Sequence, residues 1–214
     1  MTPCRGGEAP HGHSLAAACE SGDMILAIET SASQCAVALV SGRQIWRREK
    51  EMTRGHAEAL FPMIEEVLRE AGADHAALTR IAVCTGPGSF TGIRAGVAAV
   101  RGLALGLGIP AVGISRLQAF ASEDACTVAV PLRGASVALQ SFAAGQVPAN
   151  DACIVEKVPD DPDVIAPPEP ALADPVRLAR IAADVSDPPR PAPLYIRPAD
   201  AMPPVVEPIR MLDQ

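Results

Sequence analysis

The stretch Gly86-Pro87-Gly88-Ser89-Phe90-Thr91-Gly92 decides the fold of this chain, because it joins an apolar run at 81–84 to a long apolar segment at 91–107. An apolar run, a glycine turn and a longer apolar segment predict a buried strand, a tight turn and a helix. The glycines permit backbone angles closed to other residues, and Ser89 or Thr91 can cap the helix. This strand, turn and helix layout is typical of a ligand site in an α/β protein.

Two interpretations of the glycine turn stay open. Free amides at a helix N-terminus can hold an anion, so Gly86, Gly88 and Ser89 are candidate phosphate-binding residues. The phosphate-loop pattern, however, requires a lysine directly after its last glycine, and Ile93 stands there instead. The alternative is a tight turn that only packs the strand against the helix.

Segments on either side of the turn complete one α/β lobe. Apolar runs and turn residues predict an antiparallel meander of three strands, and helical spacing of apolar residues predicts an amphipathic helix before the glycine turn. The expected strands are 25–28, 35–40, 44–48, 81–85 and 109–114, and the expected helices are 56–71 and 91–107. Pro62 predicts a kink or a late start of the first helix.

The second half of the chain has a different composition. Strands are expected at 127–132 and 136–142, Pro and Asp dominate 148–170, and Asp174 with Pro175 predicts the start of a short helix to 185. No glycine follows Gly145, so half of a two-lobed nucleotide cleft lacks its usual close-approach residues. We therefore expect three regions: a flexible N-terminal tail at 1–23 with Met24 as a candidate biological start, a first lobe at 24–122, and a reduced, proline-rich second lobe at 123–214.

Composition limits the classes of function. The chain has 214 residues, 49% of them hydrophobic, which is enough for a sizeable core. No apolar stretch approaches about 18 residues and the first twenty lack a signal-peptide order, so we expect a cytoplasmic protein without a membrane partner. A net charge of −7 and 3% aromatic residues give neither a basic footprint nor stacking platforms for tight RNA binding by this chain alone. Six scattered cysteines without a C-x-x-C pair indicate neither a disulfide framework nor a zinc site.

The segment from Thr91 to Gly108 predicts a docking surface. Only Thr91, Arg94 and Arg101 interrupt its apolar and glycine residues, and a helix that is apolar nearly all round is buried on two sides. One side should pack on the sheet, and the other should meet a partner together with the 56–71 helix. The expected partner interface consists of His56, Leu60, Ile93, Arg94, Val97, Val100, Arg101 and Ala104.

Both helices are needed for such an interface. Three or four buried side chains contribute on the order of 5 kcal/mol, whereas association costs roughly 4–15 kcal/mol. The alternative is that the first helix or the second lobe covers this face within the chain itself.

Several segments resemble the TsaB family, also called YeaZ. They are Met24-Ile25-Leu26-Ala27-Ile28-Glu29-Thr30-Ser31, residues 55–58, 60–62, 85–94 and 102–106, Ile109-Pro110, and Pro193-Leu194-Tyr195-Ile196-Arg197. The family is the small partner in bacterial tRNA threonylcarbamoyladenosine synthesis. It has the fold of acetate kinases, sugar kinases, heat-shock proteins and actin, abbreviated ASKHA. The resemblance is strong over 24–120 and thin afterwards, so it implies an ASKHA mixed sheet with an intact first lobe and a shortened second lobe.

The resemblance also implies a loss of reactive groups. An acid after the first strand helps hold a nucleotide's metal and phosphates in this fold class. Glu29 stands here, and with Thr30, Ser31 and the glycine turn it forms a vestigial phosphate loop. Where related chains often read Asp-Ala-Arg, this one has Pro131-Leu132-Arg133. The catalytic sister family, TsaD, carries a metal-binding His-x-x-x-His, whose positions are matched here by Arg116 and Phe120, and neither side chain can be a ligand.

The implied function is that of a non-catalytic subunit. It would pair with a TsaD-like transferase that modifies the adenosine next to the anticodon of ANN-decoding tRNAs. A TsaE-like ATPase, tRNA bound only through the complex, and a second copy of the chain are further implied partners. We expect no catalytic residue, metal or cofactor held by this chain alone. The alternative is a free-standing ATP-dependent phosphotransferase, which Glu29, Thr30 and the glycine turn suggest. A metalloprotease is not expected, because the sequence lacks a pair of metal-binding residues.

Overall fold

A computed structural model of the chain describes residues 22–132, 134 and 136–196. Five strands form the first sheet in the order β3-β2-β1-β4-β5. They are β1 (Met24–Glu29), β2 (Gln34–Ser41), β3 (Gln44–Glu51), β4 (Arg80–Cys84) and β5 (Ala111–Ile114). Strands β1, β2 and β3 pair antiparallel, whereas β4 is parallel to β1 and β5 is parallel to β4. The predicted meander and the two later strands are confirmed.

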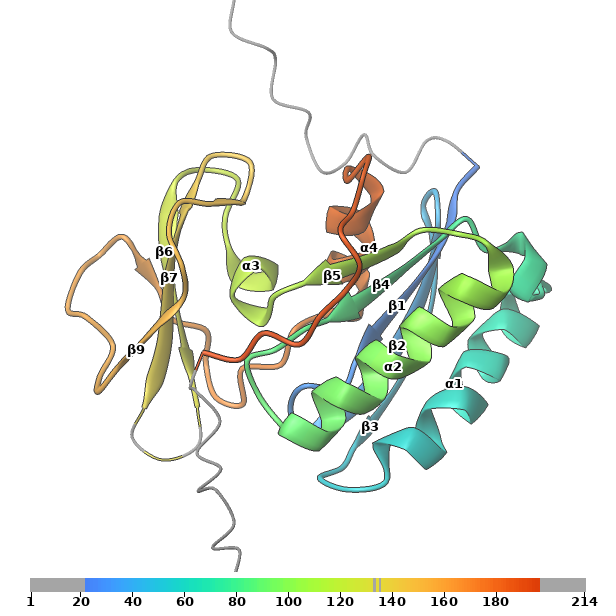
Figure 1. The fold of residues 1–214 in the computed structure, drawn as a ribbon, viewed down its shortest axis with the longest axis horizontal. Helices are drawn as coiled ribbons and strands as arrows, with labels where there is room; N and C mark the ends of the chain where they lie inside the picture. The colour runs from blue at the N-terminus through green and yellow to red at the C-terminus, as the bar shows by residue number, and fades with distance from the viewer. Residues whose placement is uncertain (1–21, 133, 135, 197–214) are drawn as a thin grey trace, which may run out of the picture.

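Helices cover both faces of the first sheet (Figure 1). Helices α1 (His56–Ala71) and α2 (Phe90–Leu107) lie on one face, and α4 (Pro175–Ala183) lies on the other. Successive side chains of a strand point to opposite faces, so Leu26 and Ile28 join the core under α1 and α2, whereas Ile25 and Ala27 join the core under α4. Both faces of the sheet are therefore buried.

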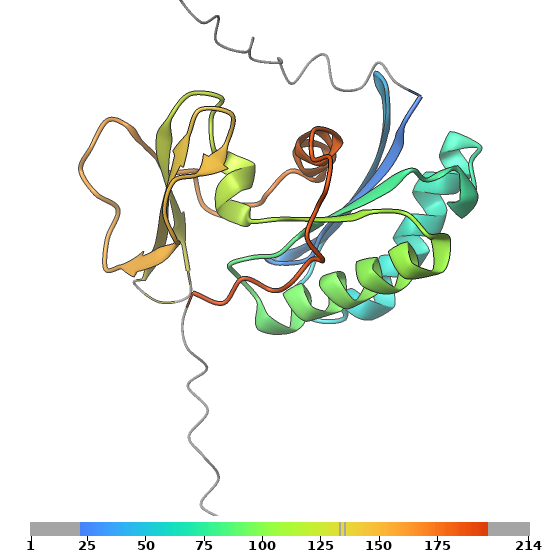
Figure 2. The same ribbon diagram turned by 45° about the horizontal axis from the view of Figure 1, so that its top comes forward.

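A smaller second sheet stands beside the first (Figure 2). Its strands are β6 (Cys126–Pro131), β7 (Val137–Ala143), β8 (Val147–Pro148) and β10 (Val164–Ile165), in the order β10-β6-β7-β8, and β9 (Cys153–Val155) also pairs with β7. The short helix α3 (Arg116–Phe120) packs on β6 and β7, and its Leu117 shares a core with Val128 and Phe142. A 3-10 turn, η1 (His75–Ala77), precedes β4.

Two local expectations need correction. Helix α1 runs from His56 to Ala71 through Pro62, so it does not start late, and the alternative expectation of a kink stays a prediction. Helix α4 was expected within the second lobe, but its buried face packs on β1, β2 and β4 of the first sheet, because Leu178 and Ile181 fill the core there. The boundaries at 23 and 122 stay predictions, and positions 1–21 of the expected tail lie outside the described residues.

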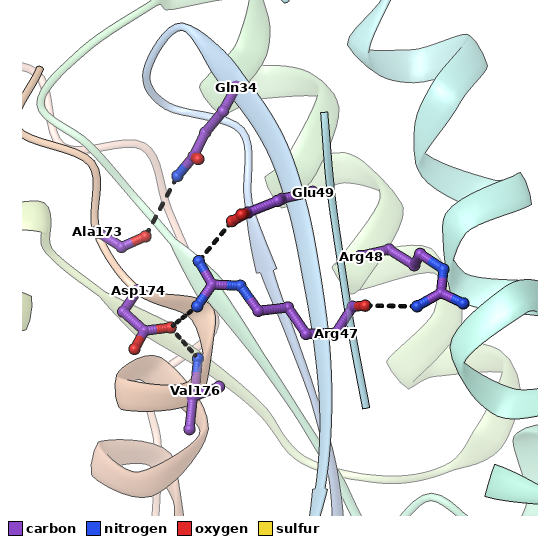
Figure 3. A network of polar contacts seen from close by, with 7 residues as sticks. All are labelled: Gln34, Arg47, Arg48, Glu49, Ala173, Asp174 and Val176. Carbon is purple, nitrogen blue, oxygen red and sulfur yellow. Dashed lines mark hydrogen bonds and ion pairs between the residues drawn. The ribbon is translucent and has the colours of Figure 1, made fainter. Parts of the chain in front are cut away.

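A polar network fixes α4 to the meander (Figure 3). Arg47 Nη1 on β3 donates to Asp174 Oδ1 over 3.3 Å, and the same oxygen accepts the amide of Val176 over 3.0 Å. Asp174 thereby caps α4, since it satisfies an amide that has no partner inside the helix. Gln34 Nε2 also donates to the carbonyl of Ala173 over 3.4 Å.

The expectation that no segment is apolar enough to cross a membrane does not hold for helix α2. By length and composition alone it meets that criterion, although a third of it is buried against this chain and core helices of globular proteins meet the same criterion.

Candidate functional site

The glycine turn lies at the C-terminal end of β4 and packs against the loop that follows β1. The amide of Ser89 donates to the carbonyl of Ser31 over 2.7 Å, and Thr30 Oγ1 donates to the carbonyl of Gly92 over 2.8 Å. A Cβ on Gly88 would lie 1.9 Å from Ser31 O, and one on Gly92 would lie 2.0 Å from Thr30 O. Glycine is therefore needed at these two positions, because a side chain there would collide with the backbone of the loop after β1.

This geometry favours the packing interpretation of the turn over the phosphate interpretation. Ser89 caps α2, and its side chain accepts the amide of Gly92 over 3.3 Å. Its own amide is satisfied by a protein carbonyl at the place where an anion would need a free donor. Gly86, with φ of 97°, supplies the left-handed conformation that lets the chain turn at the end of β4.

Glu29 is fully buried at the end of β1, below the same loop. Its Oε1 accepts the amide of Ser31, and Oε2 has no hydrogen-bond partner among residues 22–132, 134 and 136–196. The thiol of Cys84 lies 3.3 Å from Ser31 Oγ. Burial, and secondarily the charge of Glu29, raises the pKa of Cys84 well above its ordinary value. The thiol is thus protonated and closed to solvent, which is the opposite of an activated nucleophile.

Arg116 fastens the two sheets together. The side chain is 6% exposed, and its Nη1 donates to the carbonyl of Pro87 over 3.0 Å while Nη2 donates to the carbonyl of Pro131 over 3.1 Å. Burial lowers the pKa of Arg116, and the negative charge of Glu29 acts in the opposite direction. The sequence identified Arg116 only as unable to bind a metal; its role as a bridge between sheets carried no sequence signal.

A cavity of about 800 Å³ lies between the two sheets. Ser31 and Pro87 line it from the loops after β1 and β4, Leu132 and Ile154 line it from the side of the second sheet, and Leu194 lines it from the C-terminal segment. That segment is held at the end of β4, because the amide of Leu194 donates to the carbonyl of Thr85 over 2.9 Å. In the part of the chain that the structure describes, no group of three or more His, Cys, Asp or Glu side chains could hold a metal ion.

The expected partner interface requires a correction. Six of its members are buried within the protein and are 0–7% exposed. They are His56, Leu60, Ile93, Val97, Val100 and Ala104. The last four belong to the face of α2 that packs on the sheet beside α1, so they cannot also contact a partner. Arg94 is exposed and Arg101 is half-buried. His56 Nε2 has no hydrogen-bond partner within the described ranges.

The outward side of α1 and α2 carries a different set of apolar residues. We call it the outer α1–α2 face, and it consists of Phe61, Ala98, Gly102, Leu105 and Gly106. Leu105 is 80% exposed and Phe61 is 45% exposed. A shallow depression lies between the helices and is lined by Phe61, Ala98, Gly102 and Gly106. The spacing of Ala98, Gly102 and Gly106 by four residues was the sequence signal for this face.

The sheet order, the helices on both faces and the second sheet across a cavity define an ASKHA-like α/β protein. The family model of TsaD, tRNA N6-adenosine threonylcarbamoyltransferase, matches residues 49–134. The TsaB protein of Escherichia coli, described as a tRNA threonylcarbamoyladenosine biosynthesis protein, is 36% identical over 97 residues. That match spans 45% of this chain and 42% of the relative, which is less than half its length.

Two further relatives match over most of their length. An uncharacterized protein of Mycobacterium bovis is 30% identical over 199 residues, which cover 84% of this chain and 94% of that protein. The structure of YeaZ from Pseudomonas aeruginosa has a TM-score of 0.64 and 27% identity, and the match covers 75% of this chain and 90% of that one. The chain belongs to the TsaB (YeaZ) family.

Proposed function

We propose that this protein is a non-catalytic subunit of tRNA threonylcarbamoyladenosine synthesis, and that it pairs with a TsaD-like transferase acting on ANN-decoding tRNAs. The names of the matched relatives support the pathway, because TsaB proteins are described as biosynthesis proteins for this modification. The match of residues 49–134 to the TsaD model supports kinship with the proposed partner.

The observation that carries the pairing is the outer α1–α2 face. Large exposed apolar side chains that share one face are typical of protein interfaces. Leu105 and Phe61 provide such side chains on two adjacent helices. Gly102 and Gly106 line the depression beside Phe61, and their lack of side chains lets a partner helix approach closely. Two helices together offer the area that one helix lacks, since association must offset a large entropic cost.

The geometry of the cleft supports a role without catalysis or cofactor for this chain alone. The Ser89 amide is hydrogen-bonded to Ser31, the guanidinium of Arg116 is hydrogen-bonded to Pro87 in the glycine turn and to Pro131 on β6, and the Cys84 thiol is buried. Isothermal calorimetry of the isolated chain with ATP and magnesium tests the alternative phosphotransferase. We expect no heat of binding at millimolar nucleotide, and saturable heat would favour the alternative.

The remaining partners follow from the same proposal. We expect a cytoplasmic protein that meets tRNA only through the complex, with a TsaE-like ATPase as a further component. In the absence of the transferase, the outer α1–α2 face would allow a twofold pair of identical chains, because one patch can contact its own copy.

The pairing is tested by co-purification of the chain with the TsaD-like subunit of the same organism. Leu105→Lys places a charge on the outer α1–α2 face without touching the core, so we expect pairing to be lost. Val147→Lys is the matched control, because Val147 is 57% exposed on β8 of the second sheet. Equal retention of the partner by both variants would contradict the proposed interface.

A further inference from the structure

Phe90, Arg94 and Tyr195 form an exposed cluster that we call the aromatic–arginine cluster. Phe90 and Tyr195 are distant in sequence, yet their ring centroids lie 5.6 Å apart. The guanidinium carbon of Arg94 lies 3.8 Å from the centroid of Phe90 and 5.9 Å from that of Tyr195. Phe90 is 54% and Tyr195 is 48% exposed. The protein thus leaves two of its few aromatic rings uncovered beside a cation.

The cluster is already ordered for binding. Arg94 Nε donates to the Tyr195 hydroxyl over 2.9 Å, which holds the guanidinium over the Phe90 ring. Arg94 makes no ion pair with any carboxylate in the described part of the chain. A guanidinium carries five N–H donors, so one bond to Tyr195 leaves its terminal donors available for an anion. The positive charge of Arg94 is therefore uncompensated at an exposed place.

The cluster borders the glycine turn, since Phe90 directly follows Ser89, but it offers different hydrogen-bond donors. All three side chains line the edge of the cavity between the sheets, on the side of the first turn of α2 and the C-terminal segment. The backbone donor at the turn is occupied by Ser31, whereas the donors of Arg94 are side-chain groups outside that contact. A ligand held here would use these side-chain donors and not the amide of Ser89.

We propose that the aromatic–arginine cluster binds an unpaired nucleotide of an RNA, with the base stacked on an aromatic ring and the phosphate bonded to Arg94. Exposed aromatic rings stack on bases of any sequence, and arginine recognises phosphate with paired donors. The choice of an RNA rests on the proposed function, in which the substrate is a tRNA with an unpaired anticodon loop.

The cluster agrees with the expectation that the chain alone does not bind RNA tightly. One uncompensated arginine on a chain of net charge −7 gives a weak contact. Within a complex, that contact adds to those made by the partner, because the second binding event becomes intramolecular. The sequence did not reveal the aromatic–arginine cluster, because its two rings come from α2 and from the C-terminal segment, which are far apart in the chain.

The test uses the full chain in complex with its TsaD-like subunit and an anticodon stem-loop RNA that carries 5-iodouridine at an unpaired loop position. After irradiation, mass spectrometry should locate the cross-link in the peptides that contain Phe90 or Tyr195. Phe90→Leu, Tyr195→Leu and Arg94→Gln should each weaken RNA binding about tenfold, and Arg94→Gln should also reduce its salt dependence. Arg43→Gln, at an exposed turn, is the control and should bind as the unaltered protein does.

Pairing with the transferase subunit is measured for every variant in parallel. The inference requires unchanged pairing together with weaker RNA binding. Three results would each overturn it. The first is that cross-links are found only in the partner, and the second is that the variants bind RNA as tightly as the unaltered complex does. The third is that the variants lose pairing with the transferase subunit while RNA binding is not weakened. A complex that pairs and modifies tRNA while showing none of these RNA effects overturns this inference alone. Failure of the unaltered complex to support modification would instead overturn the proposed function.

Discussion

The backbone amide of Ser89 donates a 2.7 Å hydrogen bond to the carbonyl oxygen of Ser31, which joins the glycine turn to the loop after β1. This contact favours a packing role for the turn, because it occupies one of the amides that an anion could otherwise bind. It also explains why Gly88 cannot be replaced without moving the backbone, because a Cβ there would lie 1.9 Å from the same oxygen of Ser31.

The first prediction concerns those glycines. Gly88→Ala and Gly92→Ala place a Cβ about 2 Å from a backbone oxygen. Each should therefore lower the free energy of unfolding by about 2 kcal/mol or more. Gly102→Ala is the control, because nothing lies within 4 Å of its Cβ position and alanine favours the helix by about 1 kcal/mol. Urea denaturation followed by circular dichroism measures all three, and equal effects would contradict the close packing.

The second prediction concerns the bridge made by Arg116. Arg116→Met leaves the carbonyls of Pro87 and Pro131 without their donor and Glu29 without a nearby cation, so it should cost about 3 kcal/mol of stability. Hydrogen exchange should accelerate in β6 and β7, because the second sheet loses its attachment. Arg43→Met is the exposed control.

A double-mutant cycle separates the charge of Glu29 from the two carbonyl contacts. Glu29→Gln should partly offset the cost of Arg116→Met, since it removes a buried charge that has lost its cation. Additive effects of the two substitutions would show that the electrostatic contact between Glu29 and Arg116 is negligible.

The third prediction is a pH dependence. Burial raises the pKa of Cys35 from its ordinary value of 9.0 to about 11. Between these values the unfolded state has released the thiol proton and the folded state has kept it, so stability is full below pH 9 and falls as pH rises toward 11. The slope from this group is at most about 1.4 kcal/mol per pH unit. Chemical denaturation across this range should show a shallower decline for Cys35→Ala and an unchanged decline for Cys153→Ser, since Cys153 is exposed.

The fourth prediction concerns the network in Figure 3. Asp174→Ala removes the cap of α4 and should cost about 1 kcal/mol in thermal or urea unfolding. Arg47→Ala should cost at most about 0.5 kcal/mol, because its ion pair with Asp174 is largely exposed. A larger effect for Arg47 than for Asp174 would place the stabilising role in the ion pair instead of the cap.

Most of the first sheet was predictable from local patterns. Alternating or continuous apolar runs identified its strands, and the glycine turn identified the start of α2. The face of α2 that packs was not predictable, because Val97 and Leu105 are both apolar and only the position of the sheet distinguishes them. The packing of α4 and the bridge from Arg116 depend on contacts between segments far apart in the chain, which periodicity does not encode. Helix α3 and strands β8 and β10 are too short to give a periodic signal.

The most direct test of the central claim is the amount of threonylcarbamoyladenosine in tRNA from a strain that lacks this protein. Nucleoside mass spectrometry should show loss of the modification on deletion and its return with the unaltered chain or Val147→Lys. Leu105→Lys should fail to restore it, because the transferase subunit can no longer dock on the outer α1–α2 face. Normal modification in the deletion strain, or full rescue by Leu105→Lys, would contradict the account.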